Sequence, residues 1–263
     1  MQTVTLKKML TTLTENKVSY AFGSPSGPIA ITGQSQVRIK DTGRRLCVSC
    51  DRLVPKLFGQ GFCYPCFKNS PDNAECIIRP ELCRAHIGEG RDPEWEERNH
   101  NQPHCVYLAN SGGLKVGVTR TTQIPTRWMD QGACAAIVLA TTPNRYLAGV
   151  IEVEMKQFFN DKTNWQKMLK GLDPELDLAD VHQKTQSLTR PEWHDYIHPE
   201  GTIQTVKYPV TRYPDTIKST KLDNFPTITG ILMGIRGQYL IFDDNRVLNV
   251  RNHSGYEVEL TIS

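Results

Sequence analysis

Short apolar runs, separated by polar or glycine-containing segments, mark the middle of the chain and predict β-strands there. Between the second and third runs, a mixed segment that ends at Gly132 predicts a short helix, because glycine commonly terminates helices. The predicted elements, in chain order, are strands at 105–109 and 114–120, a helix within 125–133 and a strand at 133–142.

A helical period follows this strand-rich region. It predicts one helix over residues 145–172, broken near Asp161, and a second helix over 174–187. The apolar stripe of the first helix consists of Leu147, Ile151, Met155, Phe158 and Phe159.

The two ends of the chain differ in pattern. Residues 1–18 predict a short helix, because Met9, Leu10 and Leu13 fall on one helical face. Turn residues then separate strand-like runs within 19–40. From residue 199 onward the pattern is β, and the last part of the chain predicts an antiparallel meander that could complete a sheet with the strands of 19–40.

These elements predict an α+β fold with three parts. A β-rich N-terminal region spans residues 1–104, a central α/β core with its following helices spans 105–198, and the C-terminal β meander spans 199–263.

Four cysteines form two CxxC pairs within the N-terminal region, separated by 12 residues. Each CxxC places two sulfurs on one tight turn, and Zn²⁺ prefers four tetrahedral thiolates. Gly59 and Gly61 lie between the pairs, where a hairpin must turn. The spacing predicts a zinc ribbon with structural Zn²⁺; the alternatives are two disulfides or reduced core cysteines. The predicted ligands are Cys47, Cys50, Cys63 and Cys66.

Composition and charge narrow the class of protein. Hydrophobic residues make up 38% and charged residues 22%, as in soluble globular proteins, and no apolar run approaches the roughly 18 residues that span a bilayer. We therefore expect no membrane partner, and the zinc-spaced cysteines favour the cytoplasm.

Residues 1–70 contain ten lysines and arginines against three acidic residues. This basic end is either a phosphate-backbone binder or an ordinary solvated face. No nucleotide-binding glycine loop is present.

A second group of ligand-type residues lies between the ribbon and the first strand of the core. Cys83 and His86 have knuckle spacing, while His100 and His104 are four residues apart, as on one face of a helix. The alternatives are ordinary polar contacts, a buried ion-pair network or a cysteine–histidine nucleophile. The predicted set for a second metal is Cys76, Cys83, His86 and His104.

The order of strand, strand, helix, strand and helix over 105–160 resembles the GIY-YIG nuclease domain. Residues 105–107 stand at the position of its first tripeptide and 115–117 at that of its second. The longer string from ECIIRPELCRAH to DKTNWQKMLK resembles an uncharacterised bacterial family that joins a four-cysteine zinc ribbon to such a core. The resemblance implies four catalytic positions: Tyr107, Lys115, Arg127 and Glu152, with Glu154 as the nearby alternative to the last.

The chemistry implied is metal-dependent cleavage of a phosphodiester. Glu152 would hold Mg²⁺ or Mn²⁺, Arg127 would face the phosphate, and Tyr107 would position the water. The chain departs from the family at Lys115, which replaces a tyrosine, and a lysine acts as a base only when its pKa is lowered. Packing, salt bridging and solvent exposure are the alternative roles for these side chains.

Three functions remain open on the sequence. The leading one is a zinc-containing protein that binds nucleic acid, DNA or RNA, through a degenerate nuclease core. The others are an active metal-dependent endonuclease and a non-enzymatic, zinc-stabilised scaffold for a protein partner. The sequence does not determine the oligomeric state.

Overall fold

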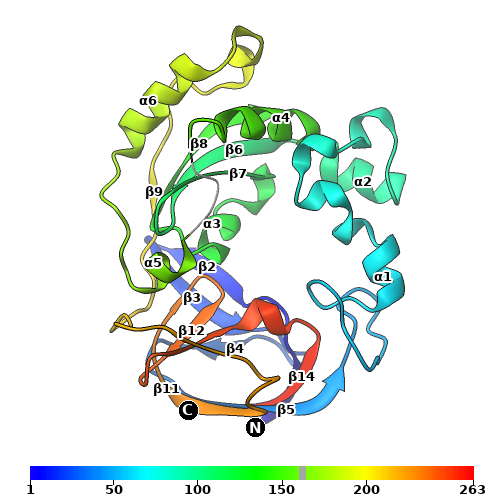
Figure 1. Cartoon of the computed structure of the whole chain (residues 1–263), viewed down its shortest axis with the longest axis vertical. Coiled ribbons are helices and arrows are strands. Elements are labelled where there is room, and N and C mark those ends of the chain that lie inside the picture. Colours follow the sequence, from blue (N-terminus) through cyan, green and yellow to red (C-terminus); the bar gives the residue numbers. More distant parts are fainter. Residues whose placement is uncertain (160–163) are drawn as a thin grey trace.

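A computed structural model describes residues 1–159 and 164–263, and it confirms the α+β class. A β-rich body, at the bottom of Figure 1, contains both termini, and a smaller α/β core lies above it. The segment that carries α1 and α2 connects the two along one side (Figure 1). None of the described helices is long and apolar enough to cross a membrane.

The β-rich body is built on a seven-stranded sheet that joins strands from both ends of the chain. The central β5 pairs with β11 on one side and with β14 on the other, both antiparallel. The expectation that the C-terminal meander completes a sheet with an N-terminal strand is therefore confirmed. In sheet order the strands are β1 (Gln2–Thr5), β14 (Tyr256–Ile262), β5 (Gln36–Arg45), β11 (Thr227–Arg236), β12 (Tyr239–Phe242), β13 (Arg246–Asn249) and β10 (Lys218–Thr220).

The prediction of a helix over residues 1–18 is wrong, because this segment forms strands. Thr14 pairs with Lys17 across a two-residue loop, and both loop residues, Glu15 and Asn16, have positive φ (48° and 66°). Such a loop is the tight turn of a β-hairpin, and the threonines around it favour strands. The resulting three-stranded sheet consists of β2 (Leu10–Thr14), β3 (Lys17–Phe22) and β4 (Ile29–Ile31).

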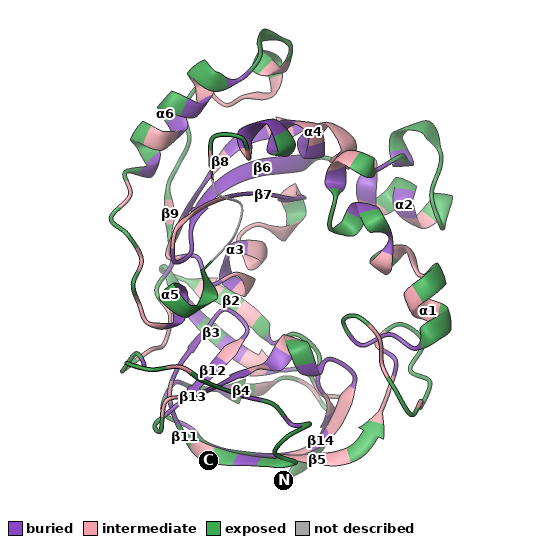
Figure 2. Cartoon of the chain, viewed as in Figure 1, coloured by how far each residue is buried: buried purple, intermediate pink, exposed green. Residues whose placement is uncertain are grey.

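The core contains the predicted order of strand, strand, helix, strand and helix. Every residue of its central strand β6 is buried (Figure 2). Val106 and Leu108 pack on the side of α4, whereas Cys105, Tyr107 and Ala109 pack on the side of α3, as the two-residue period of a strand requires. The elements are β6 (His104–Asn110), β7 (Leu114–Arg120), α3 (Thr126–Asp130), β8 (Ala135–Thr142) and α4 (Arg145–Met155), with β9 (Gln204–Thr205) at the edge beside β8.

The remaining helices flank these two bodies. The helix expected over 145–172 appears as α4 and a short α5, and the break expected near Asp161 lies outside the described residues. The helix expected over 174–187 is α6, displaced by a few residues. The helices beside α3 and α4 are α1 (Tyr64–Asn69), α2 (Pro93–His100), α5 (Trp165–Leu169) and α6 (Leu178–Leu188). Short 3₁₀ turns are η1 (Pro71–Asn73), η2 (Glu75–Ile77), η3 (Pro80–Leu82), η4 (Ala85–Ile87), η5 (Thr121–Gln123), η6 (Pro191–Tyr196) and η7 (Val250–His253).

Candidate functional site

The four cysteines of the two CxxC pairs come together. Their sulfurs all lie within 4.8 Å of one another, and the Sγ atoms of Cys50 and Cys63 are 3.8 Å apart. Two thiolates on a tetrahedral zinc, with bonds of about 2.3 Å, would be separated by about 3.8 Å. All eight cysteines of the chain are free, so disulfides do not explain the proximity. Four cysteines in this arrangement can bind a structural metal ion.

Backbone geometry builds this cluster from its two turns. Phe58 and Phe62 pair across the predicted hairpin, whose Gly59 and Gly61 have φ of +56° and +99°. Burial raises the pKa of the Cys47 thiol, but backbone N–H groups in both knuckles outweigh that effect and lower it to about 6. Burial, with hydrogen bonds to Cys63 and Cys50, instead raises the pKa of the Cys66 thiol to about 12. A metal ligand must be deprotonated, so Cys47 is the cysteine whose surroundings favour metal binding.

A second cluster of ligand-type side chains lies where α2 meets the 3₁₀ turns. Among the described residues it consists of Cys76, Cys83, Glu96 and His100, all buried, with ligand atoms within 4.8 Å of one another. The Nδ1 atom of His100 is 3.6 Å from the sulfur of Cys83 and 3.9 Å from that of Cys76. A hydrogen bond from the Cys76 thiol lowers the pKa of Cys83 to about 4, and His100 adds to that effect.

The two other histidines predicted for this cluster lie elsewhere. The ring of His86 stacks on Tyr146 at 4.6 Å between centroids. His104 opens β6, where its Nδ1 contacts the backbone oxygen of Gln102 at 2.7 Å. The knuckle spacing therefore relates Cys83 to a histidine outside the cluster, whose other members are Cys76, Glu96 and His100.

All four predicted catalytic side chains line one cavity of about 570 Å³ against β7. Tyr107 and Gly117 are cross-strand neighbours, and a Cβ at position 117 would meet the Tyr107 hydroxyl at 2.6 Å. Only glycine therefore lets the ring lie over β7. Residues that carry formal charge around the cavity are Lys8, Asp72, Lys115, Arg120, Arg127, Asp130, Arg145, Glu152, Lys156 and Arg251.

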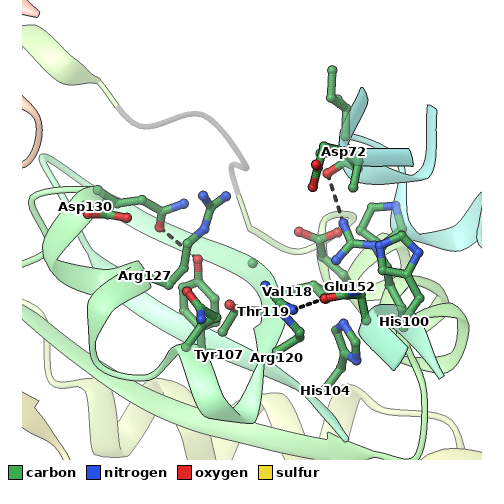
Figure 3. A pocket seen from close by; sticks show the side chains of 18 of the residues that line it. Asp72, His100, His104, Tyr107, Val118, Thr119, Arg120, Arg127, Asp130 and Glu152 are labelled. Carbon is green, nitrogen blue, oxygen red and sulfur yellow. Dashed lines mark hydrogen bonds between the residues drawn. The ribbon is translucent and has the colours of Figure 1, made fainter. Parts of the chain in front are cut away.

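Tyr107 and Arg127 meet through the amide of Gln131. The Tyr107 hydroxyl is 2.8 Å from this amide. Figure 3 shows Tyr107 and Arg127 on the same side of the cavity. With the amide oxygen turned toward Arg127, that oxygen lies 3.3 Å from Nε and 3.2 Å from Nη2 of the guanidinium. Burial raises the pKa of Tyr107, although Arg127 acts to lower it. The tyrosine is therefore a neutral hydroxyl that can orient a ligand or a water.

Three more arginines reach the cavity, and neutral groups hold each of them. Arg120 donates to the Asn99 side chain at 2.5 Å, and Arg251 donates to Gln60 at 3.0 and 2.8 Å. Arg145 donates to two backbone carbonyls of η2, each at 3.0 Å. Amide and carbonyl partners orient a guanidinium without neutralising it, so the positive potential of the cavity remains available to an anion.

Two carboxylates of the cavity, unlike its arginines, lie close to oppositely charged side chains. Asp130 pairs with Lys8 at 2.8 Å. Glu152 lies 3.4 Å from the Lys156 ammonium, and among the described residues its Oε2 has no partner with hydrogen-bond geometry. Burial raises the pKa of Glu152, although Lys156, Lys115 and Arg145 act to lower it. The surroundings of Glu152 are therefore cationic.

Glu154, the alternative to Glu152, takes part in a different set of contacts. Its carboxylate accepts from the indole of Trp193 at 3.0 Å and from the backbone N–H of Arg190 at 3.1 Å. It thus fastens α4 to η6, whereas Glu152 lines the cavity.

Sequence reasoning missed part of the cavity wall. Lys8 and Arg251 come from opposite ends of the chain, and only the tertiary fold brings them to the core. Glu96 was missed as well, although a signal for it exists. It stands four residues before His100 on a helix that begins with Asp92 and Pro93, a standard helix start.

The fold and these sites define the class: an α+β protein with a four-cysteine cluster that can bind a structural metal ion, beside a cationic cavity. The chain belongs to the family described as Protein of unknown function (DUF2797), whose model matches residues 34–258. No curated protein and no solved structure matches the chain. The matched range contains both cysteine clusters and all four predicted catalytic positions.

Proposed function

We propose that this protein binds nucleic acid and holds backbone phosphates in the cationic cavity. The observation that carries the proposal is the set of four arginines that reach the cavity while their hydrogen-bond partners are amides and carbonyls: Arg120, Arg127, Arg145 and Arg251. Planar guanidinium groups match phosphate geometry, and orientation by neutral partners reduces the ordering cost when the anion binds.

The proposal includes a route for a strand beyond the cavity. A second cavity of about 640 Å³ borders the four-cysteine cluster and shares several lining residues with the first, Lys8, Gln60 and Arg251 among them. Aromatic side chains lie at the ribbon end, including Phe67 in this cavity wall and the half-exposed Tyr64. A basic groove with aromatic surface is the usual arrangement for single-stranded nucleic acid.

Zinc is the metal we propose for the four-cysteine cluster, where it would organise this end of the groove. Four thiolates around one ion leave no open coordination position, so the ion would be structural. Cys47, Cys50, Cys63 and Cys66 would hold it.

Replacing Arg127 with glutamine tests the binding proposal. Loss of a charge-assisted contact costs about 1.5–3 kcal/mol, so affinity for a labelled oligonucleotide should fall roughly 10-fold or more. Fluorescence anisotropy with single-stranded and duplex DNA and RNA measures the change. The control is Lys184→Gln, which removes the same charge from α6, where Lys184 pairs with Asp180. Equal affinity of both variants would contradict the proposal.

The second candidate function is a metal-dependent endonuclease. It is favoured by the meeting of Tyr107, Lys115, Arg127 and Glu152 in one cavity, in the element order of a GIY-YIG domain. Tyr107 would position the water, Arg127 would stabilise charge on the phosphate, and Glu152 would hold Mg²⁺ or Mn²⁺. The cationic side chains around Glu152 would repel a divalent metal ion, so we rank nucleic-acid binding above cleavage.

Glu152→Gln distinguishes the two functions. Glutamine is nearly isosteric and removes a negative charge from the cavity, so phosphate binding should be unchanged or tighter. Cleavage of the same oligonucleotides with Mg²⁺ or Mn²⁺ should be undetectable for both the wild type and the variant. If the wild type cleaves and Glu152→Gln does not, the site is catalytic. A protein that neither binds nor cleaves would favour the scaffold function.

A further inference from the structure

We propose that Cys76, Cys83, Glu96 and His100 form a second zinc site, separate from the four-cysteine cluster. The four come from η2, the turn after η3 and helix α2, so the site would tie three short elements together. Two thiolates, one imidazole and one carboxylate are a ligand set that suits Zn²⁺.

The spacing of the ligand atoms matches a tetrahedral ion. Zinc bonds of about 2.0–2.3 Å place neighbouring ligand atoms roughly 3.3–3.8 Å apart. The Nδ1 atom of His100 lies 3.6 Å from the Cys83 sulfur, 3.9 Å from the Cys76 sulfur and 3.8 Å from Oε2 of Glu96. These three separations are close to those of a four-coordinate site.

A second shell holds the carboxylate in place. The backbone N–H of Arg91 donates to Oε1 of Glu96 at 2.8 Å, which leaves Oε2 facing His100. The ring of Trp95 meets His100 edge-on at 5.2 Å. Hydrogen bonds to the outer atom of a ligand commonly orient metal-binding side chains.

Burial of these polar side chains is energetically unfavourable unless an ion compensates their lost hydration. Glu96 is 2% exposed and His100 3% exposed. Burying a carboxylate costs several kcal/mol unless a positive partner compensates it. A divalent cation among two thiolates, an imidazole and this carboxylate would supply that compensation.

The segment around the cluster has little hydrophobic core of its own. Its buried apolar cluster contains two alanines and the two cysteines, with Tyr146 packed against it. Ile78 and Ile87 of the same segment are 84% and 54% exposed. Small units that cannot bury enough apolar surface commonly depend on a metal. The ion would be structural, because four protein ligands close the site.

The second site would also hold one wall of the cationic cavity. Helix α2 contributes Trp95, Asn99 and His100 to that wall, and Asn99 orients Arg120. The zinc would thereby act on the position of the arginine through α2.

Zinc content and zinc K-edge absorption of the wild type test the inference, after saturation with Zn²⁺ and removal of the excess. Both clusters together should give two zinc ions per chain, with an average shell of three sulfurs and one nitrogen or oxygen. One zinc per chain with an all-sulfur shell would overturn the second site and leave the ribbon intact.

Cys83→Ser provides the matched variant. It should retain one zinc ion, with four sulfur ligands, while Cys134→Ser should retain both ions because Cys134 lies in neither cluster. If Cys83→Ser retains two ions, the inference is wrong. If that variant does not fold, the wild-type measurement decides alone.

Discussion

Cys63→Ser is expected to release the metal of the four-cysteine cluster and to unfold its surroundings while the β-rich body stays folded. Helix α1 begins directly after Cys63 and has no fully buried residue (Figure 2). Partly exposed aromatic contacts, those of Tyr64 and Phe67 with Phe58, would then be left to hold it to the ribbon. Structural zinc contributes roughly 10–16 kcal/mol of apparent binding free energy in small zinc modules, and the loss of one thiolate removes a large part of it.

Limited proteolysis with mass spectrometry, together with zinc analysis, measures this effect. New cleavage should appear within residues 47–70 of Cys63→Ser, and the wild type treated with a strong chelator should show the same pattern. Cys134→Ser is the control, since Cys134 lies outside both clusters and its thiol donates to the backbone oxygen of Asn110, at 3.5 Å. A Cys63→Ser protein that keeps its full zinc content and the wild-type digestion pattern would refute a metal-held ribbon.

Arg236→Met is expected to produce the largest loss of stability outside the metal sites. The Arg236 side chain is 1% exposed and forms a bidentate pair with Asp173, at 2.7 and 2.8 Å. It also donates twice to the backbone oxygen of Gly132, at 3.0 and 2.9 Å. These contacts connect β11 of the body to two loops of the core: Asp173 lies between α5 and α6, and Gly132 lies between α3 and β8.

Breaking a buried pair on one side leaves an uncompensated carboxylate and costs about 3–5 kcal/mol. For a chain of this size that lowers the melting temperature by roughly 6–20 °C, which differential scanning calorimetry can measure. The double variant Arg236→Met with Asp173→Asn should regain part of the loss, because it removes the unpaired charge. Lys184→Met, which removes an exposed ion pair, should change stability by about 0.5 kcal/mol or less. A melting temperature of Arg236→Met near that of Lys184→Met would contradict this account of the buried pair.

The same contacts give Arg236 a link to the cavity. The Gly132 carbonyl that it holds directly follows Gln131, whose amide lies between Tyr107 and Arg127. Weaker oligonucleotide binding by Arg236→Met would therefore accompany its loss of stability.

Much of the fold could be predicted because local patterns determine it. The core elements follow from the apolar runs at 105–109 and 114–120 and from the stripe that begins at Leu147. The N-terminal error arose because Met9, Leu10 and Leu13 fit a helical period over too few residues to exclude a hairpin. The turn at Glu15 and Asn16, with its flanking threonines, was the stronger signal.

The candidate sites also differ in whether a local sequence pattern or only the tertiary fold brings their residues together. The four-cysteine cluster could be predicted because CxxC spacing encodes its geometry within one short segment. The second cluster could be predicted only in part, since Cys76 and Cys83 meet Glu96 and His100 through the packing of α2. The four arginines of the cavity come from β7, α3, α4 and η7, so no local pattern relates them.

The salt dependence of oligonucleotide binding by the wild-type protein tests the central claim most directly. Each phosphate neutralised contributes a slope of about −0.9 in log K against log salt for duplex and about −0.7 for a single strand, so four arginines predict a slope of roughly −3 to −4. A slope in that range, reduced by about one in Arg127→Gln, is the result that we expect. Absence of binding at low salt, or affinity independent of salt, would contradict a phosphate-binding cavity.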